Sequence, residues 1–173
     1  MNIEEKLLNG NKEFISKMKN SEEKLKRNEL LAKGQSPYAL IICCSDSRVI
    51  PEEIFNVSLG EIFTIRSAGN VINAGELASI EYGIEHLHIN YVLVLAHTSC
   101  GAIHASIHDE KGKYLASILD KIKLGIKGEK DERKASIINA NEQVNYLKKM
   151  FPDYQGEIKS GLYDINNNEV IIF

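Results

Sequence analysis

The 173-residue sequence has no tryptophan, only three cysteines and no long apolar run. Because no run approaches the ~20 apolar residues that span a bilayer, we expect no membrane-spanning helix. Charge of one sign is not in excess either, since the formal net charge is −3 at pH 7. This balance gives no global electrostatic reason to bind nucleic acid or an anionic membrane. Apolar residues make up 43% and charged residues 26%, as in an ordinary globular domain.

The first residues, "MNIEEKLLNGNKEF", carry acids where a signal peptide would carry bases, and they contain no apolar segment. We therefore predict a cytoplasmic protein. In that compartment, three cysteines indicate metal ligands or reactive thiols rather than disulfides. Cys43 and Cys44 are adjacent and would point to opposite faces of a strand, so at most one should face a site. The other is expected to be a small buried hydrophobe.

The chain alternates between helical and strand-like segments. A helical pattern runs from the N-terminus to Gly34, and Pro37 prevents its continuation. Buried strands are predicted at "YALIICC", "EIFTIR" and "YVLVLAH", and closing strands at "EIKSGLYDI" and "EVIIF". Helices are predicted after Pro51, over 73–87 and across most of 100–151. The sequence therefore predicts one α/β domain over 1–173, with a mostly parallel central sheet flanked by helices and an N-terminal helical arm over 1–34.

Residues of the metal-ligand type follow two of these strands. Cys44 ends the first strand, in "CCSDSR", while His97 and Cys100 end the third, in "HTSC". Sites in open α/β sheets gather at the carboxyl ends of strands. Two thiolates and one imidazole suit Zn²⁺, and three protein ligands are typical of a catalytic rather than a structural zinc site.

Other interpretations of these residues remain open at this point. A buried cysteine is usually a small hydrophobe, and a single H-x-x-C pair is a weak signal. "CSDSR" could also suggest a cysteine phosphatase, but those loops place five residues between Cys and Arg, whereas three stand here. The remaining histidines are most simply exposed or capping residues: His86, His88, His104 and His108. His104 and His108 have the spacing of a zinc-binding pair, but the sequence offers no third ligand nearby.

Taken together, "CSDSR" and "HTSCG" resemble the β-class carbonic anhydrases. Further landmarks of that family follow in family order: "GQSP", "VIPEEIF", "GEIFTIRSAGN", "SIEYGIEHL" and "GLYDINNNEVIIF". The resemblance covers roughly Gln35 to Phe173. It implies a carbonate dehydratase that reversibly hydrates CO₂ to bicarbonate and a proton, by attack of a zinc-bound hydroxide.

Residue by residue, the resemblance implies that Cys44, His97 and Cys100 bind Zn²⁺. Asp46 and Arg48 would form the carboxylate–guanidinium dyad of the family, in which the arginine holds the carboxylate ionised and oriented.

The resemblance also points to the plant-type branch, whose substrate pocket contains a Gln, a Phe and a Tyr. Gln35, Phe63 and Tyr82 stand at the matching positions. A homodimer or homotetramer is implied, with N-terminal helices that wrap a neighbouring subunit and a pocket at the dimer interface.

Three departures from the family stand out. Ala96 replaces the usual glycine before the histidine, and Ser67 stands where Asn is common. The C-terminus is short for the family, so we expect a C-terminal element to be missing. The lack of tryptophan disfavours the noncatalytic bicarbonate site of some relatives.

Two other functions fit the same residues. One is hydrolysis of carbonyl sulfide or carbon disulfide on the same scaffold, which pocket shape would decide. The other is a noncatalytic zinc-binding module. Asp46 and Arg48 argue against the second, because a storage site has no use for such a pair.

Overall fold

The structure, a computed structural model, describes residues 2–19 and 22–173. The chain divides into two compact units, Met1–Ser36 and Pro37–Phe173. The predictions of one domain over the whole chain and of an arm that ends at residue 34 stay predictions.

The first unit consists of two helices, α1 (Ile3–Met18) and α2 (Glu22–Lys33). Asn2 begins α1 with a capping box: its side chain accepts a hydrogen bond from the Glu5 amide at 2.7 Å, and the Glu5 carboxylate accepts one from the Asn2 amide at 2.9 Å. Gly34 follows α2 with φ +77°, the left-handed conformation that commonly ends helices. Neither helix buries any of its described side chains.

The second unit is built on a five-stranded sheet with the strand order β2-β1-β3-β4-β5. Four strands are parallel: β1 (Ala39–Cys43), β2 (Ile62–Arg66), β3 (Tyr91–His97) and β4 (Glu157–Asp164). The last strand, β5 (Glu169–Ile172), pairs antiparallel with β4. Every residue of β1 is buried, as expected of a parallel strand covered on both faces. The predicted α/β fold with a mostly parallel sheet is confirmed.

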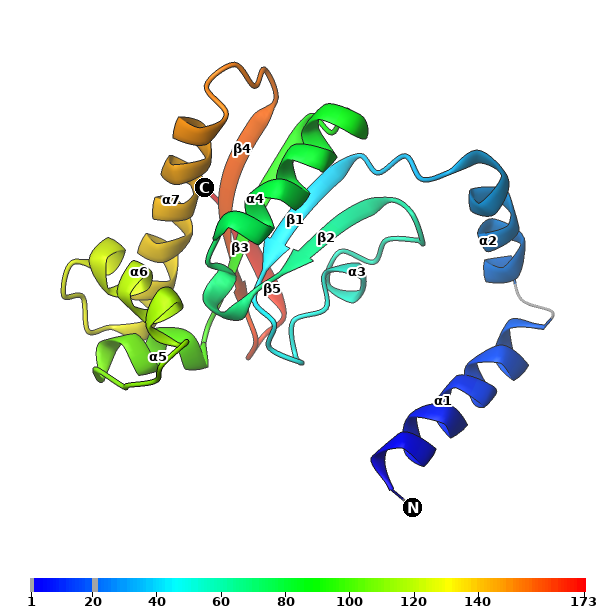
Figure 1. Ribbon diagram of the computed structural model, residues 1–173, viewed down its shortest axis with the longest axis horizontal. Coiled ribbons are helices and arrows are strands. Elements are labelled where there is room, and N and C mark those ends of the chain that lie inside the picture. Colours follow the sequence, from blue (N-terminus) through cyan, green and yellow to red (C-terminus); the bar gives the residue numbers. More distant parts are fainter. Residues whose placement is uncertain (1, 20–21) are drawn as a thin grey trace. The chain divides into compact units, whose positions relative to one another are not determined.

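Helices pack on one face of this sheet, and one short helix lies on the other (Figure 1). On one face, α4 (Ala74–Glu81) and α7 (Glu132–Met150) pack over Leu40, Ile42 and Val94. On the other face, the short helix α3 (Pro51–Ile54) and the segment after it pack over Ile41 and Leu93. Pro51 is the first residue of α3, where its missing amide hydrogen costs no hydrogen bond.

A third apolar cluster lies where β1 and β3 end. It is formed by α5 (Gly101–Ile107), α6 (Ala116–Ile126) and the beginning of α7, together with Val71, which follows the short helix η1 (Ala68–Asn70). Cys44 and Cys100 belong to this cluster, alongside Ile103 and Ile122. The thiol groups of Cys44 and Cys100 therefore lie in an apolar environment, where electrostatic interactions are strong.

The helix predicted over 73–87 is interrupted. Its start is as predicted, with Asn73 and Glu76 in a capping box, but α4 ends at Glu81 and a wider π-helical turn, η2 (Tyr82–His86), follows. A β-carbon on Gly83 in this turn would lie 2.7 Å from Leu40 Cδ1. The glycine therefore allows the turn to approach β1 closely.

No helix in the described parts of the chain is both long and apolar enough to cross a bilayer. The longest, α7, has 19 residues and carries charged side chains at both of its ends.

Candidate metal centre

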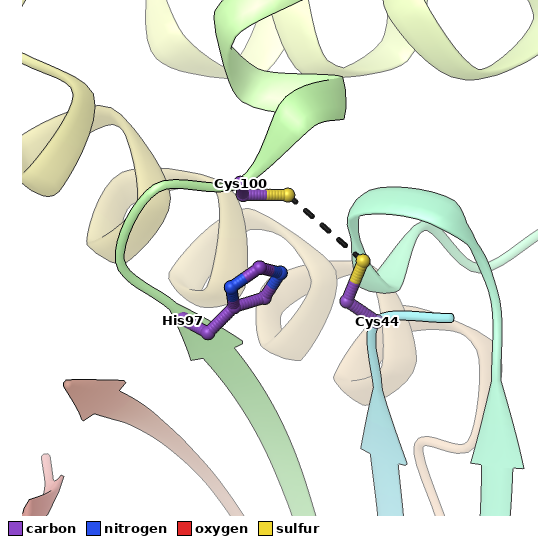
Figure 2. Close-up of side chains that lie close together, drawn as sticks. All are labelled: Cys44, His97 and Cys100. Atoms are coloured by element: carbon purple, nitrogen blue, oxygen red, sulfur yellow. Dashed lines mark hydrogen bonds between the residues drawn. The ribbon is translucent and has the colours of Figure 1, made fainter. Parts of the chain in front are cut away.

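Three side chains of the metal-ligand type converge at the carboxyl end of the sheet (Figure 2). Cys44 directly follows β1, His97 is the last residue of β3, and Cys100 precedes the first residue of α5. β1 and β3 are neighbours, and Cys43 pairs with Leu95 in their register. Both strands therefore end at the same level, which brings the side chains that follow them together.

The geometry fits a metal ion. The two sulfur atoms are 3.9 Å apart, and one ligand atom from each of the three residues lies within 4.8 Å of the other two. His97 Nδ1 is 2.9 Å from the Thr98 carbonyl oxygen, so Nδ1–H must be the donor. His97 Nε2 then carries the lone pair, and it is buried without a hydrogen-bond partner. Such an orphaned acceptor beside two thiols is what a metal-binding imidazole requires.

Hydrogen bonds favour negative charge on the Cys44 sulfur atom over the Cys100 sulfur atom. A hydrogen bond from the Cys100 thiol lowers the pKa of Cys44 to about 4, and the backbone amides of Asp46 and Gly69 act in the same direction. The same hydrogen bond, together with burial, raises the pKa of Cys100 above its ordinary value. A metal ion bound to both sulfur atoms would displace the remaining thiol proton, because metal ligands must be deprotonated.

A hydrogen-bond chain from α7 supports Cys44. Gly69, at φ +64°, donates its amide hydrogen to Cys44 Sγ at 3.3 Å. Its carbonyl accepts from Asn139 Nδ2 at 2.8 Å, and Gln143 Nε2 is 3.4 Å from Asn139 Oδ1. Sequence reasoning missed Gly69 and Asn139 as supports of the site. One feature of the sequence could have indicated such supports: polar side chains on the otherwise apolar face of a helix.

Asp46 and Arg48 form a tightly paired dyad. The Arg48 guanidinium donates from Nε to Asp46 Oδ1 at 2.9 Å and from its second amino group to Oδ2 at 2.8 Å. The Arg48 amide adds a third bond, of 3.0 Å, to Oδ1. These bonds hold the pKa of Asp46 well below its usual range. Arg48 also donates to the carbonyl of Ser99 at 3.2 Å, which ties the dyad to the loop that carries Cys100.

Arg66, another residue that sequence reasoning missed, fixes the loop between these groups. Its guanidinium donates to the carbonyl oxygens of Asp46 at 2.7 Å and Cys44 at 3.3 Å. As the last residue of β2, Arg66 lies at the strand end next to β1. Its position at a strand end was the available signal.

Cys43 is directed away from the site. It is fully buried with Ile41 and Leu95 on the face of the sheet that α3 covers. Burial raises its pKa to about 12, so it stays a neutral thiol. This agrees with the expectation that only one of the two adjacent cysteines faces the site.

Two of the three predicted pocket residues, Phe63 and Tyr82, lie in the second unit with the metal centre. The rings of Phe63 and Tyr82 lie together, with centroids 6.2 Å apart. Phe63 pairs with Leu40, four residues before Cys44, which corresponds to about 13 Å along the strand. Gln35 belongs to the first unit. Their roles in substrate binding stay predictions.

Glu132 corrects the expectation that His104 and His108 have no third ligand nearby. Its carboxylate oxygen lies 2.7 Å from His104 Nδ1, and the three side chains form a second group that could hold a metal. Glu132 is 28 residues away in sequence, so only the fold brings it there.

Comparisons with known proteins agree with this centre. The family model described as "Carbonic anhydrase" matches residues 39–166. Carbonic anhydrase 2 of Mycobacterium tuberculosis (strain ATCC 25618 / H37Rv) is 40% identical over 102 residues, which cover 58% of this chain and 49% of that protein. The chain thus spans about half the length of this curated relative.

Solved structures show the same architecture. The β-carbonic anhydrase CcaA superposes with a TM-score of 0.82 at 28% identity, covering 99% of this chain and 95% of that one. One of two tetrameric β-carbonic anhydrases from Sordaria macrospora gives a TM-score of 0.82 at 21% identity, covering 100% and 98%, and shows likeness of fold. The matched family model spans most of the chain, and the Cys44, His97 and Cys100 group lies within it. This chain belongs to the β-class carbonic anhydrase family.

Proposed function

We propose that this chain catalyses the reversible hydration of CO₂ to bicarbonate and a proton, with Zn²⁺ held by Cys44, His97 and Cys100. One observation carries the proposal. Two thiols and a buried, unpartnered imidazole nitrogen converge on one point, beside a carboxylate that an arginine orients. Three protein ligands are the number typical of catalytic zinc sites.

The ligand residues are prepared for a cation. The Thr98 carbonyl oxygen holds the imidazole of His97 in the tautomer that leaves Nε2 free. The Gly69 amide donates to Cys44 Sγ and offsets part of the negative charge that the thiolate carries. A bound Zn²⁺ supplies a nucleophile near neutral pH, because it lowers the pKa of a coordinated water from ~15.7 to about 7.

Asp46 is proposed to orient this nucleophile. Its carboxylate stays ionised, because the Arg48 guanidinium holds its pKa well below the usual range. An ionised carboxylate can only accept hydrogen bonds, so Asp46 accepts a hydrogen bond from the O–H group of the nucleophile. This bond directs the lone pair of the nucleophile's oxygen at the carbon of CO₂. The bidentate contact of Arg48 fixes the plane of the carboxylate.

We further propose that a second copy of the chain completes the substrate pocket. Phe63 and Tyr82 form an aromatic pair, and the exposed ring of Tyr82 is available to a neighbouring subunit. Helix α1 also exposes apolar side chains along its length: Ile3, Leu7, Leu8, Phe14 and Ile15. The expected assembly is a homodimer or homotetramer, with Gln35 donating to a substrate oxygen as in the plant-type branch.

Stopped-flow CO₂ hydration with a pH indicator tests the proposed reaction, on protein whose zinc content has been measured. Hydration should disappear when a chelator removes the metal and return when Zn²⁺ is added. Asp46→Asn should retain the metal and lower kcat/KM about 100-fold or more, because the amide can donate to the nucleophile and is neutral. Asp153→Asn, at an exposed residue on another loop, is the matched control and should keep full activity.

Full metal content without hydration at any pH from 6.5 to 9 would overturn the proposed reaction. Turnover of carbonyl sulfide or carbon disulfide in place of CO₂ would overturn the substrate assignment while retaining the site. Unchanged hydration by Asp46→Asn would refute the role of that carboxylate alone.

A further inference from the structure

A second cluster of metal-ligand side chains lies on the surface of the second unit. His104 is on α5, His108 is the residue that ends that helix, and Glu132 is the first residue of α7. One ligand atom from each residue lies within 4.8 Å of the other two. The rings of His104 and His108 are 4.2 Å apart between centroids.

We propose that His104, His108 and Glu132 form a second metal site, which binds a divalent cation of the Zn²⁺, Ni²⁺ or Cu²⁺ type. Two imidazoles and one carboxylate form a donor set that proteins use for Zn²⁺. Imidazole nitrogen suits these later transition metals, whereas Mg²⁺ and Ca²⁺ prefer sites built from oxygen donors alone. The site shares no ligand with the Cys44, His97 and Cys100 centre.

An ordinary ion pair explains only part of this arrangement. A hydrogen bond accounts for the 2.7 Å contact between His104 Nδ1 and the Glu132 carboxylate. That contact does not involve His108, whose ring lies against the ring of His104 with centroids 4.2 Å apart. One cation between the rings and the carboxylate satisfies all three side chains at once.

Neighbouring charges leave the cluster accessible to a cation. Lys130 donates to the carbonyl oxygen of Ile107, and Arg133 is paired with Asp164. The side chains of His104 and Glu132 remain 52% and 40% exposed, so an ion can reach them directly from solvent. The ligand atoms already lie close together, which reduces the ordering required on binding.

The proposed ion would join the end of α5 to the beginning of α7. Cys100 immediately precedes α5, and His104 lies four residues further on, about 6 Å along the helix axis. Both ends of α5 would then be held by metals. Binding at the second site should therefore raise the melting temperature of the folded protein.

Equilibrium dialysis of the full chain against Zn²⁺, followed by metal analysis, tests the proposal. The wild type should bind two equivalents, and His104→Gln/His108→Gln should bind one. Glu132→Gln should weaken the second equivalent about tenfold or more. The matched control His86→Gln/His88→Asn removes two exposed histidines elsewhere and should still bind two equivalents.

Titration with Co²⁺ separates the two sites. Cobalt in the thiolate centre gives sulfur-to-metal charge-transfer absorption, whereas cobalt at a nitrogen and oxygen site does not. Cys44→Ser should weaken that absorption, because only one of the two thiolate ligands remains, and should retain the second equivalent. One equivalent in the wild type, or two in His104→Gln/His108→Gln, would overturn the second site. If the charge-transfer absorption did not appear when Co²⁺ was added to the wild type, that result would instead count against the proposed function.

Discussion

Cys43 and Cys44 are neighbours in sequence, but their side chains lie in different environments. Cys43 is surrounded by apolar side chains on one face of the sheet, and burial raises its pKa to about 12. Cys44 receives hydrogen bonds that lower its pKa to about 4. Because side chains alternate along an extended chain, two consecutive residues can be an inert thiol and a proposed metal ligand.

Substitution of each cysteine should show this difference. Cys44→Ser should weaken the charge-transfer absorption of the Co²⁺-loaded protein, because a hydroxyl replaces one of the two thiolate ligands. Cys43→Ala should retain it and cost about 1 kcal/mol of unfolding free energy from the lost packing. Absorption spectra and urea titrations measure the two effects. If Cys44→Ser kept the full absorption of the wild type, Cys43 would become the candidate ligand.

Arg48 should control the ionisation of Asp46. The folded-state pKa of Asp46 is depressed, so its ionised carboxylate stabilises the fold above the unfolded value of about 3.9. That contribution is lost as the pH falls through the lower, folded-state value. Arg48→Gln should raise the pKa of Asp46 toward 3.9, as followed by NMR of labelled aspartate carboxyls. An unchanged titration would show that Arg48 does not hold the carboxylate.

Arg48→Lys should also be more damaging than its unchanged charge suggests. A lysine cannot reproduce the two parallel hydrogen bonds to the Asp46 carboxylate, so the orientation of the carboxylate is lost. We expect kcat/KM for CO₂ to fall about 10- to 100-fold while the metal content stays the same. Activity equal to that of the wild type would mean that charge alone suffices.

At the residue scale, the sequence indicated the three candidate ligands more readily than the residues that support them. Cys44, His97 and Cys100 stand out because their residue types are uncommon at strand ends. Arg66 and Asn139 do not, because their roles depend on contacts with residues 22 and 70 positions away. Glu132 was missed for the same reason, since its contact with His104 spans 28 positions.

At the scale of elements, η1 links the sheet to the helices behind the metal centre. Its glycine, Gly69, lies at φ +64° and donates to Cys44, and a β-carbon there would lie 2.9 Å from Ile122 Cδ1. Backbone conformation and close packing therefore both require glycine at this position.

Two glycine substitutions separate these requirements. Gly128 also has a positive φ, of +87°, but has open space around its α-carbon. Gly128→Ala should therefore cost only the conformational penalty, about 1–2 kcal/mol. Gly69→Ala should add about 1–3 kcal/mol of overpacking and weaken metal binding. Urea unfolding and metal competition measure both variants. Equal losses of unfolding free energy in the two variants would mean that the side chains packed around Gly69 adjust freely.

The strands were predictable as elements because continuous apolar runs such as "YVLVLAH" are typical of covered parallel strands. The end of α4 was not predictable from the sequence. Apolar residues continue at helical spacing to Leu87, and a π-helical turn adds only one residue per turn, which this spacing does not reveal. Contact between Gly83 and Leu40 accompanies the wider turn.

At the scale of the whole molecule, α1 is notable because its apolar side chains are exposed. Leu7 should lie at a contact between subunits in the proposed assembly. Leu7→Glu should shift the protein toward monomers in light scattering, because a charge there would lose its water on association. The control Lys12→Glu changes the net charge of the helix more than Leu7→Glu does. It replaces a polar side chain rather than an apolar one, so the assembly of this variant should persist. A monomeric wild type would contradict the assembly.

The order of strands has a consequence for how quickly bound ions turn over. Cys44 follows β1 and His97 ends β3, and both strands have a paired strand on either side. Central strands open only in rare fluctuations of a fold, so an ion held there should leave slowly. An ion at His104, His108 and Glu132 faces solvent and should equilibrate much sooner. The buried centre would exchange its ion over long times, while the surface cluster would follow the metal concentration around the protein.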